Sequence, residues 1–140
     1  MSDRHATPLE VVTTFNEALG RRDWATFASV LGEDLRYTVM SFHLPGGGAS
    51  MDRPTLLATL PRMLELFAPG SPRLEFTHVT VDGEWIVVEM EGTGEFVNGA
   101  EYRNRYANVY QVRDGLIRTV REYMDTGHMA QLLSALSPPA

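Results

Sequence analysis

Hydrophobic residues recur at helical spacing in three stretches of the first half of the chain. The first stretch begins at Thr7, which forms a capping box with Glu10 three residues later. The second begins after Asp23, another residue type that caps helices. The third carries Pro61, which should bend the helix or end its first half. The pattern predicts three helices, over residues 7–20, 23–32 and 52–67.

Alternation with a period of two replaces the helical spacing in the second half. Asp-Gly or Asn-Gly pairs separate four such runs, and these pairs tolerate the positive φ that hairpin turns need. An earlier run precedes the third helix. The pattern predicts an α+β protein with helices on one face of a curved antiparallel sheet, whose strands cover residues 34–42, 73–81, 84–97, 100–112 and 116–124.

Composition and charge narrow the class of protein. The 140 residues are 44% hydrophobic and 21% charged, as in ordinary globular proteins. The net charge of −6 argues against binding to nucleic acid, and no apolar stretch approaches the roughly 18 residues of a membrane span. The N-terminus lacks a signal peptide's apolar segment, and there is no cysteine. We expect a single-domain, cytoplasmic protein.

Two glutamates interrupt the second strand of the meander. Side chains alternate across a strand, so Glu89 and Glu91 share one face, about 7 Å apart. If Asn98-Gly99 forms a two-residue turn, Glu91 lies opposite Tyr106 and both acids line a pocket. If the loop has three residues and ends in a left-handed glycine, Glu91 lies opposite Arg105 in a solvated charge ladder. The pattern alone leaves both registers open.

The segments NGAEYRNRYANVYQVRDGLI and REYMDT resemble the SnoaL-like branch of the nuclear transport factor 2 superfamily. That superfamily includes ketosteroid isomerases, limonene-epoxide hydrolases and polyketide cyclases. The resemblance implies one domain over residues 1–140, with an ordered core at about 7–136. It also implies a cone-shaped antiparallel sheet with three N-terminal helices over its concave face, a mostly apolar pocket, no cofactor and a homodimer.

The catalytic groups of ketosteroid isomerases are mostly missing from this chain. By counting along the sequence, they fall on Phe15, Val39 and Asn108, and only Asn108 can still donate a hydrogen bond. Steroid isomerisation by that mechanism is therefore not expected.

More of the catalytic residue types of the epoxide hydrolases are retained in this chain. Their tyrosine falls on Tyr37, and their Asp-Arg-Asp trio falls on three acids, Glu89, Glu91 and Glu122. Glu89 replaces the arginine that bridges the two acids in those enzymes, and its loss argues against ordinary epoxide hydrolysis. The resemblance nevertheless favours the register that places the glutamates in the pocket.

The last hairpin favours the same placement of the glutamates in the pocket. If Arg113, Asp114 and Gly115 form a three-residue loop, Glu122 lies opposite Tyr106, on the face of Asn108. We therefore take Glu89 and Glu91 as pocket-facing. Glu122 is then the expected base and Glu91 the expected acid, with Glu89 and Tyr37 beside them. Expected substrate contacts are Asn108, Tyr106, Asn104, Phe15, Val39, His43, Val120 and Met124.

Other residues carry weaker hypotheses. Asp125 is a second candidate acid, but it better fits the N-cap of a helix that begins near His128. His78 fits the core or the pocket rim, and no spacing motif predicts a metal site. The expected ligand is a small, mostly apolar molecule. The alternative is a non-catalytic binding module or assembly subunit, and a cavity of roughly 300 Å³ or more with converging acids would favour the enzyme.

The strand face opposite the expected pocket is apolar. It would carry Val79, Ile86, Val88 and Val109, which is too much apolar surface to leave in contact with water. Part of this face is expected to meet a second copy of the chain.

Overall fold

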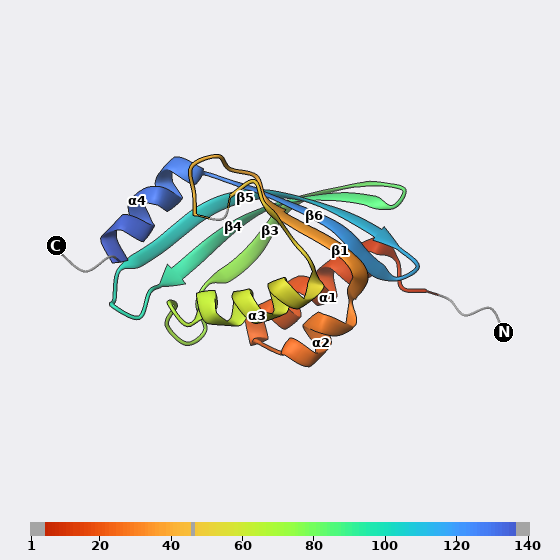
Figure 1. Cartoon of the computed structure of the whole chain (residues 1–140), viewed down its shortest axis with the longest axis horizontal. Coiled ribbons are helices and arrows are strands. Elements are labelled where there is room, and N and C mark those ends of the chain that lie inside the picture. The colour runs from red at the N-terminus through yellow and green to blue at the C-terminus, as the bar shows by residue number, and fades with distance from the viewer. Residues whose placement is uncertain (1–4, 46, 137–140) are drawn as a thin grey trace.

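The computed structural model describes residues 5–45 and 47–136. Three helices lie against one side of the sheet, and the fourth lies at the end of the molecule that carries the C-terminus (Figure 1). In chain order the elements are α1 (Pro8–Arg21), α2 (Trp24–Ser29), β1 (Leu31–Val39), β2 (Ser50–Met51), α3 (Arg53–Leu64), β3 (Arg73–Asp82), β4 (Trp85–Glu95), β5 (Glu101–Arg113), β6 (Leu116–Met124) and α4 (Thr126–Leu136).

The sheet has six strands in the order β2-β1-β6-β5-β4-β3. The meander from β3 to β6 is antiparallel, as predicted, but β1 runs parallel to β6, so the sheet is mixed. The turn signals fix the direction of consecutive strands only, and no hairpin joins β1 to β6. The predicted α+β class, with helices packed over one face of a curved sheet, is confirmed.

The β4–β5 register differs from the one we preferred. Phe96 and Ala100 flank a three-residue loop, in which Gly99 has a φ of 86° and the Asn98 side chain accepts a hydrogen bond from the Ala100 N–H at 2.9 Å. Glu91 therefore lies opposite Arg105, and the expected two-residue turn is wrong.

Burial explains this register. Ile86, Val88, Met90 and Phe96 point into the core, each at most 2% exposed. The Phe96 ring packs against Tyr102, with ring centroids 5.5 Å apart. Shifting the pairing by one residue would expose these side chains and bury the glutamates between them.

The last hairpin also differs in detail. Asp114 and Gly115 have φ values of 54° and 72°, so they form a two-residue turn, and a bulge follows between Gln111 and Val112. Glu122 consequently lies opposite Asn108, two positions from the Tyr106 pairing that we expected. A shift of two residues keeps every side chain on its face, so Glu122 still points to the inner side of the sheet.

The second helix is shorter than predicted. It ends at Ser29, and β1 begins at Leu31, so Gly32 belongs to the strand. A Cβ at Gly32 would stand 2.8 Å from the Asp34 carboxylate and 2.9 Å from the Arg118 guanidinium. Gly32 therefore lies within a strand, beneath the paired Asp34 and Arg118 side chains, and does not end a helix.

The hydrophobic core lies between the inner face of the sheet and the N-terminal helices. Phe15 of α1 contacts Phe27 of α2 and Tyr110 of β5, with ring centroids 4.6 Å and 5.7 Å apart. Leu56 and Leu60 of α3 close the core from its other side.

We expect Gly99→Ala to lower the free energy of unfolding by about 1–2 kcal/mol, because the positive φ at this loop disfavours any Cβ. The matched control is Gly20→Ala in α1, where a Cβ meets no atom within 4 Å and φ is not positive. That change should raise the free energy by about 0.4–1 kcal/mol. Urea denaturation checks both values, and equal effects would contradict the three-residue loop.

Candidate functional site

A cavity of about 190 Å³ lies between the inner face of the sheet and helices α1, α3 and α4. Most of its lining is apolar, from residues such as Leu60, Met90 and Met129. The polar groups that reach it come from Asn16, Tyr37, Tyr102, Tyr106, Asn108 and Glu122. A mostly apolar cavity with a few polar groups is the usual form of a small-molecule site, although this one is smaller than typical drug-sized pockets.

Glu122 is the one carboxyl among the described residues that line this cavity. It lies on β6 between Val39 of β1 and Asn108 of β5. The Tyr37 hydroxyl donates a hydrogen bond to Glu122 Oε2. Parallel pairing of β1 with β6 brings these two side chains together, since Tyr37 lies beside Val120, two residues before Glu122.

Burial sets the protonation of this pair. Removal from water raises the pKa of Glu122 above its ordinary value of 4.5, and the hydrogen bond from Tyr37 partly opposes the rise. Burial, together with the nearby Glu122 charge, raises the pKa of Tyr37 well above 10. Tyr37 is therefore a neutral hydrogen-bond donor, and Glu122 is the member of the pair that can lose its proton at the lower pH.

A second polar group stands beside this pair. Asn108, directly opposite Glu122, is 7% exposed, and its Nδ2 lies 3.4 Å from the Tyr110 hydroxyl. Asn16 of α1 donates to the same hydroxyl at 3.3 Å and to the Val12 carbonyl at 2.9 Å. Asn16 and Asn108 line the cavity, and the buried Tyr110 hydroxyl lies behind them.

The structure brings together most of the expected site residues. Phe15, Val39, Tyr106 and Met124 line the cavity beside Tyr37, Asn108 and Glu122. Val120 is fully buried on the same sheet face but is not among the cavity-lining residues. Asn104 is buried and lines a surface groove instead, and His43 is exposed in the loop after β1.

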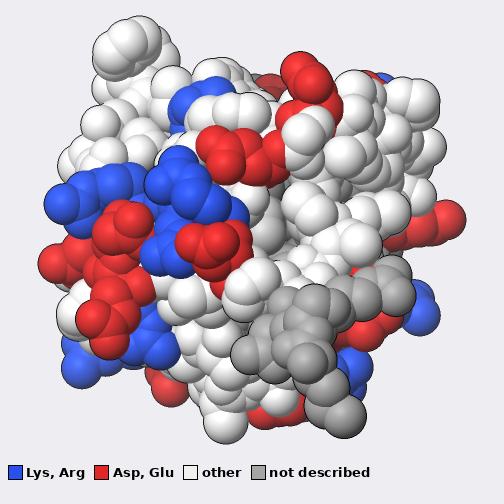
Figure 2. Space-filling model, turned by 90° about the vertical axis from the view of Figure 1, so that its right-hand side faces the viewer, with Lys and Arg blue, Asp and Glu red and all other residues white. Residues whose placement is uncertain are grey.

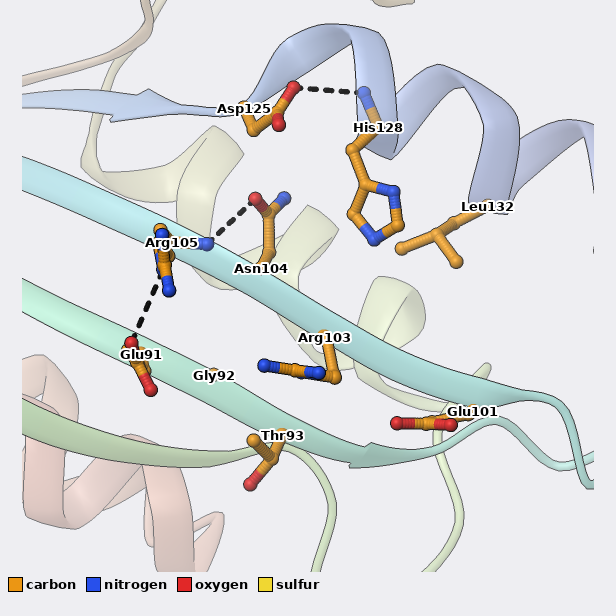
Figure 3. Close-up of a pocket in the computed structure, with 10 residues that line it drawn as sticks. All are labelled: Glu91, Gly92, Thr93, Glu101, Arg103, Asn104, Arg105, Asp125, His128 and Leu132. Atoms are coloured by element: carbon orange, nitrogen blue, oxygen red, sulfur yellow. Dashed lines mark hydrogen bonds and ion pairs between the residues drawn. The ribbon is translucent and has the colours of Figure 1, made fainter.

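Glu89 and Glu91 do not reach the cavity, so the expected role of Glu91 as its acid is wrong. Glu91 pairs with Arg105 on the outer face of the sheet (Figure 3), with 3.2 Å between Glu91 Oε1 and Arg105 Nε and side-chain exposures of 43% and 79%. Glu89 is exposed opposite Ala107. His78 pairs with Glu89 on the same face and is exposed, so it belongs neither to the core nor to the cavity rim.

Asp125 caps α4. Its Oδ1 accepts a hydrogen bond from the His128 backbone N–H at 3.0 Å, at the point where the chain leaves β6 (Figure 3). The carboxyl is exposed and lies on the surface groove. The geometry thus matches the helix-cap interpretation of this residue.

Three polar residues of the site were missed by sequence reasoning, namely Asn16, Tyr102 and Tyr110. Asn16 is the one strongly polar side chain on the apolar stripe of α1, between Phe15 and Leu19, which was the available signal. Tyr110 has the same strand parity as Asn108, but its contact with a helix 94 residues away could not be read from the sequence.

The surface charge and the other features below add little evidence about the function of the protein. Acidic and basic side chains are interspersed on the face shown in Figure 2, which presents no uniformly basic area. Over the ranges 5–45 and 47–136, no helix has the length and apolar character needed to cross a membrane. No group of three or more potential metal-binding side chains is found over the same ranges.

Comparisons with known proteins agree on the fold. A family model described as a SnoaL-like domain matches residues 12–120. An NTF2-like protein from Burkholderia thailandensis E264 is 20% identical, with a TM-score of 0.77 over 95% of this chain and 99% of that one. Among curated proteins, none matches significantly.

Two further solved structures have described activities. Wild-type IdmH, a putative polyketide cyclase from Streptomyces antibioticus, is 19% identical, with a TM-score of 0.74 over 92% of this chain and 99% of that one. An LEH-like epoxide hydrolase from M. tuberculosis is 22% identical, with a TM-score of 0.73 over 89% and 86%. At these identities the likeness shows the fold alone.

The raised pKa of Glu122 makes stability depend on pH. Folding favours the protonated carboxyl, so this stabilising effect is full below the unfolded pKa and is lost as the pH rises through the folded pKa. Glu122→Gln keeps the shape and an acceptor for Tyr37 but carries no charge. We expect this variant to melt above the wild type at pH 8, with the difference disappearing near pH 4.

Thermal melts between pH 4 and pH 8 check this expectation. Asp125→Asn is the matched control, because Asn also caps helices and the change should cost about 1 kcal/mol or less at every pH. A Glu122→Gln melting point that falls below the wild type as the pH rises would contradict the desolvation of this carboxyl.

Proposed function

Because the chain belongs to the SnoaL-like family, we propose that it binds a small, mostly apolar molecule in the cavity and moves a proton on it through Glu122. The observation that carries this proposal is a carboxyl in an apolar cavity, held by a neutral tyrosine. Desolvation brings its pKa closer to neutrality, which suits general acid–base catalysis.

The cavity volume limits the size of the ligand. An apolar cavity of about 150 Å³ holds a benzene molecule, so about 190 Å³ suits one substituted ring. The lining residues of α3 and α4, among them Met63 and Met129, have flexible side chains that adapt to ligand shape.

A single carboxyl narrows the chemistry. With Glu91 outside the cavity, Glu122 has no second carboxyl beside it among the described lining residues. Glu122 as a carboxylate would take a proton from the ligand, leaving the electron pair of the broken bond on the ligand, and then return that proton to another atom of it. A transfer in which the ligand regains the proton that it lost suits isomerisation or ring closure and needs no cofactor. The Tyr37 hydrogen bond would hold the carboxylate in place.

The structural neighbours include a putative polyketide cyclase and an epoxide hydrolase, which is in keeping with acid–base chemistry in this kind of cavity. A non-catalytic ligand-binding module is the second candidate. It is favoured by the cavity's volume, which is below about 300 Å³, and by the presence of one acid where three were expected.

Glu122→Gln is expected to keep ligand binding and to lower turnover by on the order of 10²-fold or more, the usual share of one acid–base group. A thermal-shift screen of neutral monocyclic ketones, epoxides, lactones and alkenes would first find ligands, since binding to the folded state raises the melting temperature. Ligands that bind are then incubated with the protein, and products are measured by mass spectrometry.

Asp125→Asn is the control, because this acid caps a helix and should leave turnover intact. Loss of turnover in Asp125→Asn but not in Glu122→Gln would contradict the site. Ligands that bind but are not converted by the wild type would favour the binding module.

We also propose a homodimer, which the family resemblance implies. The dimer surface expected from the sequence is wrong in part, because Val79, Ile86 and Val88 lie on the inner face of the sheet. Of that set only Val109 lies on the outer face, together with the partly exposed Trp85 and Val87. This smaller apolar strip is the surface proposed for the second copy.

Light scattering at micromolar concentration should give twice the 15.6 kDa mass of the chain. Val109→Glu should shift the mass to the monomer, because it places a charge in the apolar strip. Val97→Glu, in a hairpin loop where the residue is 64% exposed, should not. A monomeric wild type would contradict the dimer.

A further inference from the structure

A second hollow lies behind one wall of the cavity. It is an open groove of about 700 Å³ between α1 and the edge strand β3, with Gly20 of α1 and Phe76 of β3 among its lining residues. Three residues, Asn16, Pro72 and Leu74, line both the groove and the cavity. One layer of side chains therefore separates the two hollows.

Two of these three residues are held in place. The Asn16 amide donates a hydrogen bond to the Val12 carbonyl at 2.9 Å, within α1. The ring of Pro72 is closed onto its own backbone and cannot rotate, and the carbonyl of the preceding Ser71 accepts a hydrogen bond from the Arg22 guanidinium at 3.0 Å. Neither residue can move aside without breaking a bond that the fold makes.

Leu74 is the member of the wall that can move. Its side chain is apolar, only partly buried, and has two bonds about which it rotates between staggered positions. In the described sheet β3 is an edge strand, so Leu74 has a strand neighbour on one side only. That neighbour is Gly92, which has no side chain. The groove offers the space into which Leu74 can turn.

The groove fits an uncharged, apolar chain. Leu74 and Phe76 lie on the inner face of β3 and pack against the core, yet both stay partly exposed where they line the groove. The charged residues that line it are two acids and two arginines, namely Glu17, Glu75, Arg21 and Arg73. Because these charges balance, the groove favours neither an anion nor a cation.

The volume of the cavity is the last observation. At about 190 Å³ it is smaller than the roughly 300–1,000 Å³ of most ligand sites, whereas cavity and groove together reach that range. We propose that Leu74 is the gate between the two hollows, and that the ligand is an elongated molecule with an apolar ring in the cavity and an uncharged alkyl chain in the groove. The ring passes Leu74 first, and the chain follows. This inference rests on the proposed function and names the shape of the ligand.

Two ring ketones test whether a chain takes this path. Cyclohexanone fits the cavity by itself, and 4-pentylcyclohexanone adds an unbranched chain. The dissociation constants of both are measured by NMR titration of the wild type. We expect the pentyl probe to bind more tightly by about tenfold or more, because each CH₂ group that leaves water strengthens binding roughly fourfold. Its chain should also shift the backbone amide signals of Gly20 and Phe76, which cyclohexanone should leave unchanged.

Gly20→Trp fills the groove from α1, at a position outside the cavity lining where a Cβ meets no atom within 4 Å. It should lower the preference for the pentyl probe to near onefold and leave the binding of cyclohexanone unchanged. Arg62→Trp is the matched control, because it adds the same ring at an exposed position of α3 outside the lining of both hollows. This control should keep the preference.

Leu74→Ala tests the gate itself. With the side chain shortened, the pentyl probe should associate and dissociate faster by roughly two- to tenfold, the effect of no longer turning Leu74 away from its preferred rotamer. NMR line shapes during the titration give both rates. Rates equal to those of the wild type overturn the gate.

The remaining outcomes separate this inference from the proposed function. If cyclohexanone binds but the pentyl probe binds no more tightly, or if Gly20→Trp keeps the preference, the path through the groove is overturned and the proposed function stands. Met63→Trp tests the opposite side of the cavity, where this lining residue of α3 is 49% exposed. Loss of the preference there, and not in Gly20→Trp, likewise overturns the path. If neither probe binds, the proposed function fails together with this inference.

Discussion

Burial of Ile86, Val88, Met90 and Phe96 on the inner face of the sheet fixes the orientation of β4. Because side chains alternate, this one choice sends Glu89 and Glu91 to the outer face and fixes which residues of β5 and β6 face the helices. The three-residue loop that ends at Gly99 is the local feature that allows it. A one-residue shift would bury two charges and expose four large apolar side chains.

The same constraint determines the chemistry of the cavity. With the glutamates of β4 outside, the polar groups inside are tyrosines, asparagines and a single acid. The pKa of Glu122 is then shifted by burial and by one hydrogen bond from Tyr37, without like charges beside the carboxyl. The described lining of the cavity therefore holds a lone carboxyl with neutral polar groups around it, which differs from the paired acids that the sequence suggested.

Much of the fold could be predicted from local signals. Capping residues at Thr7 and Asp23 and the glycine-containing turns mark the helices and the meander, as observed. The site depends on register, which the turns left ambiguous between two loop lengths. The alternation of Ile86, Val88 and Met90 favoured the observed register, but Trp85 and Val87 on the other parity offered an equally apolar face. The Asn16–Tyr110 contact joins elements far apart in the chain, so only the folded structure shows it.

Glu122 is a carboxyl that Tyr37 holds by a hydrogen bond in a mostly apolar cavity. An NMR titration of the glutamate side-chain carboxyl carbons, with Glu122→Gln to assign the resonance, measures the effect of this environment on the pKa of Glu122. We expect Glu122 to titrate above its ordinary value of 4.5, and higher still in Tyr37→Phe, because the hydrogen bond that favours the carboxylate is gone. A Glu122 that titrates at or below 4.5, with no change in Tyr37→Phe, would contradict it.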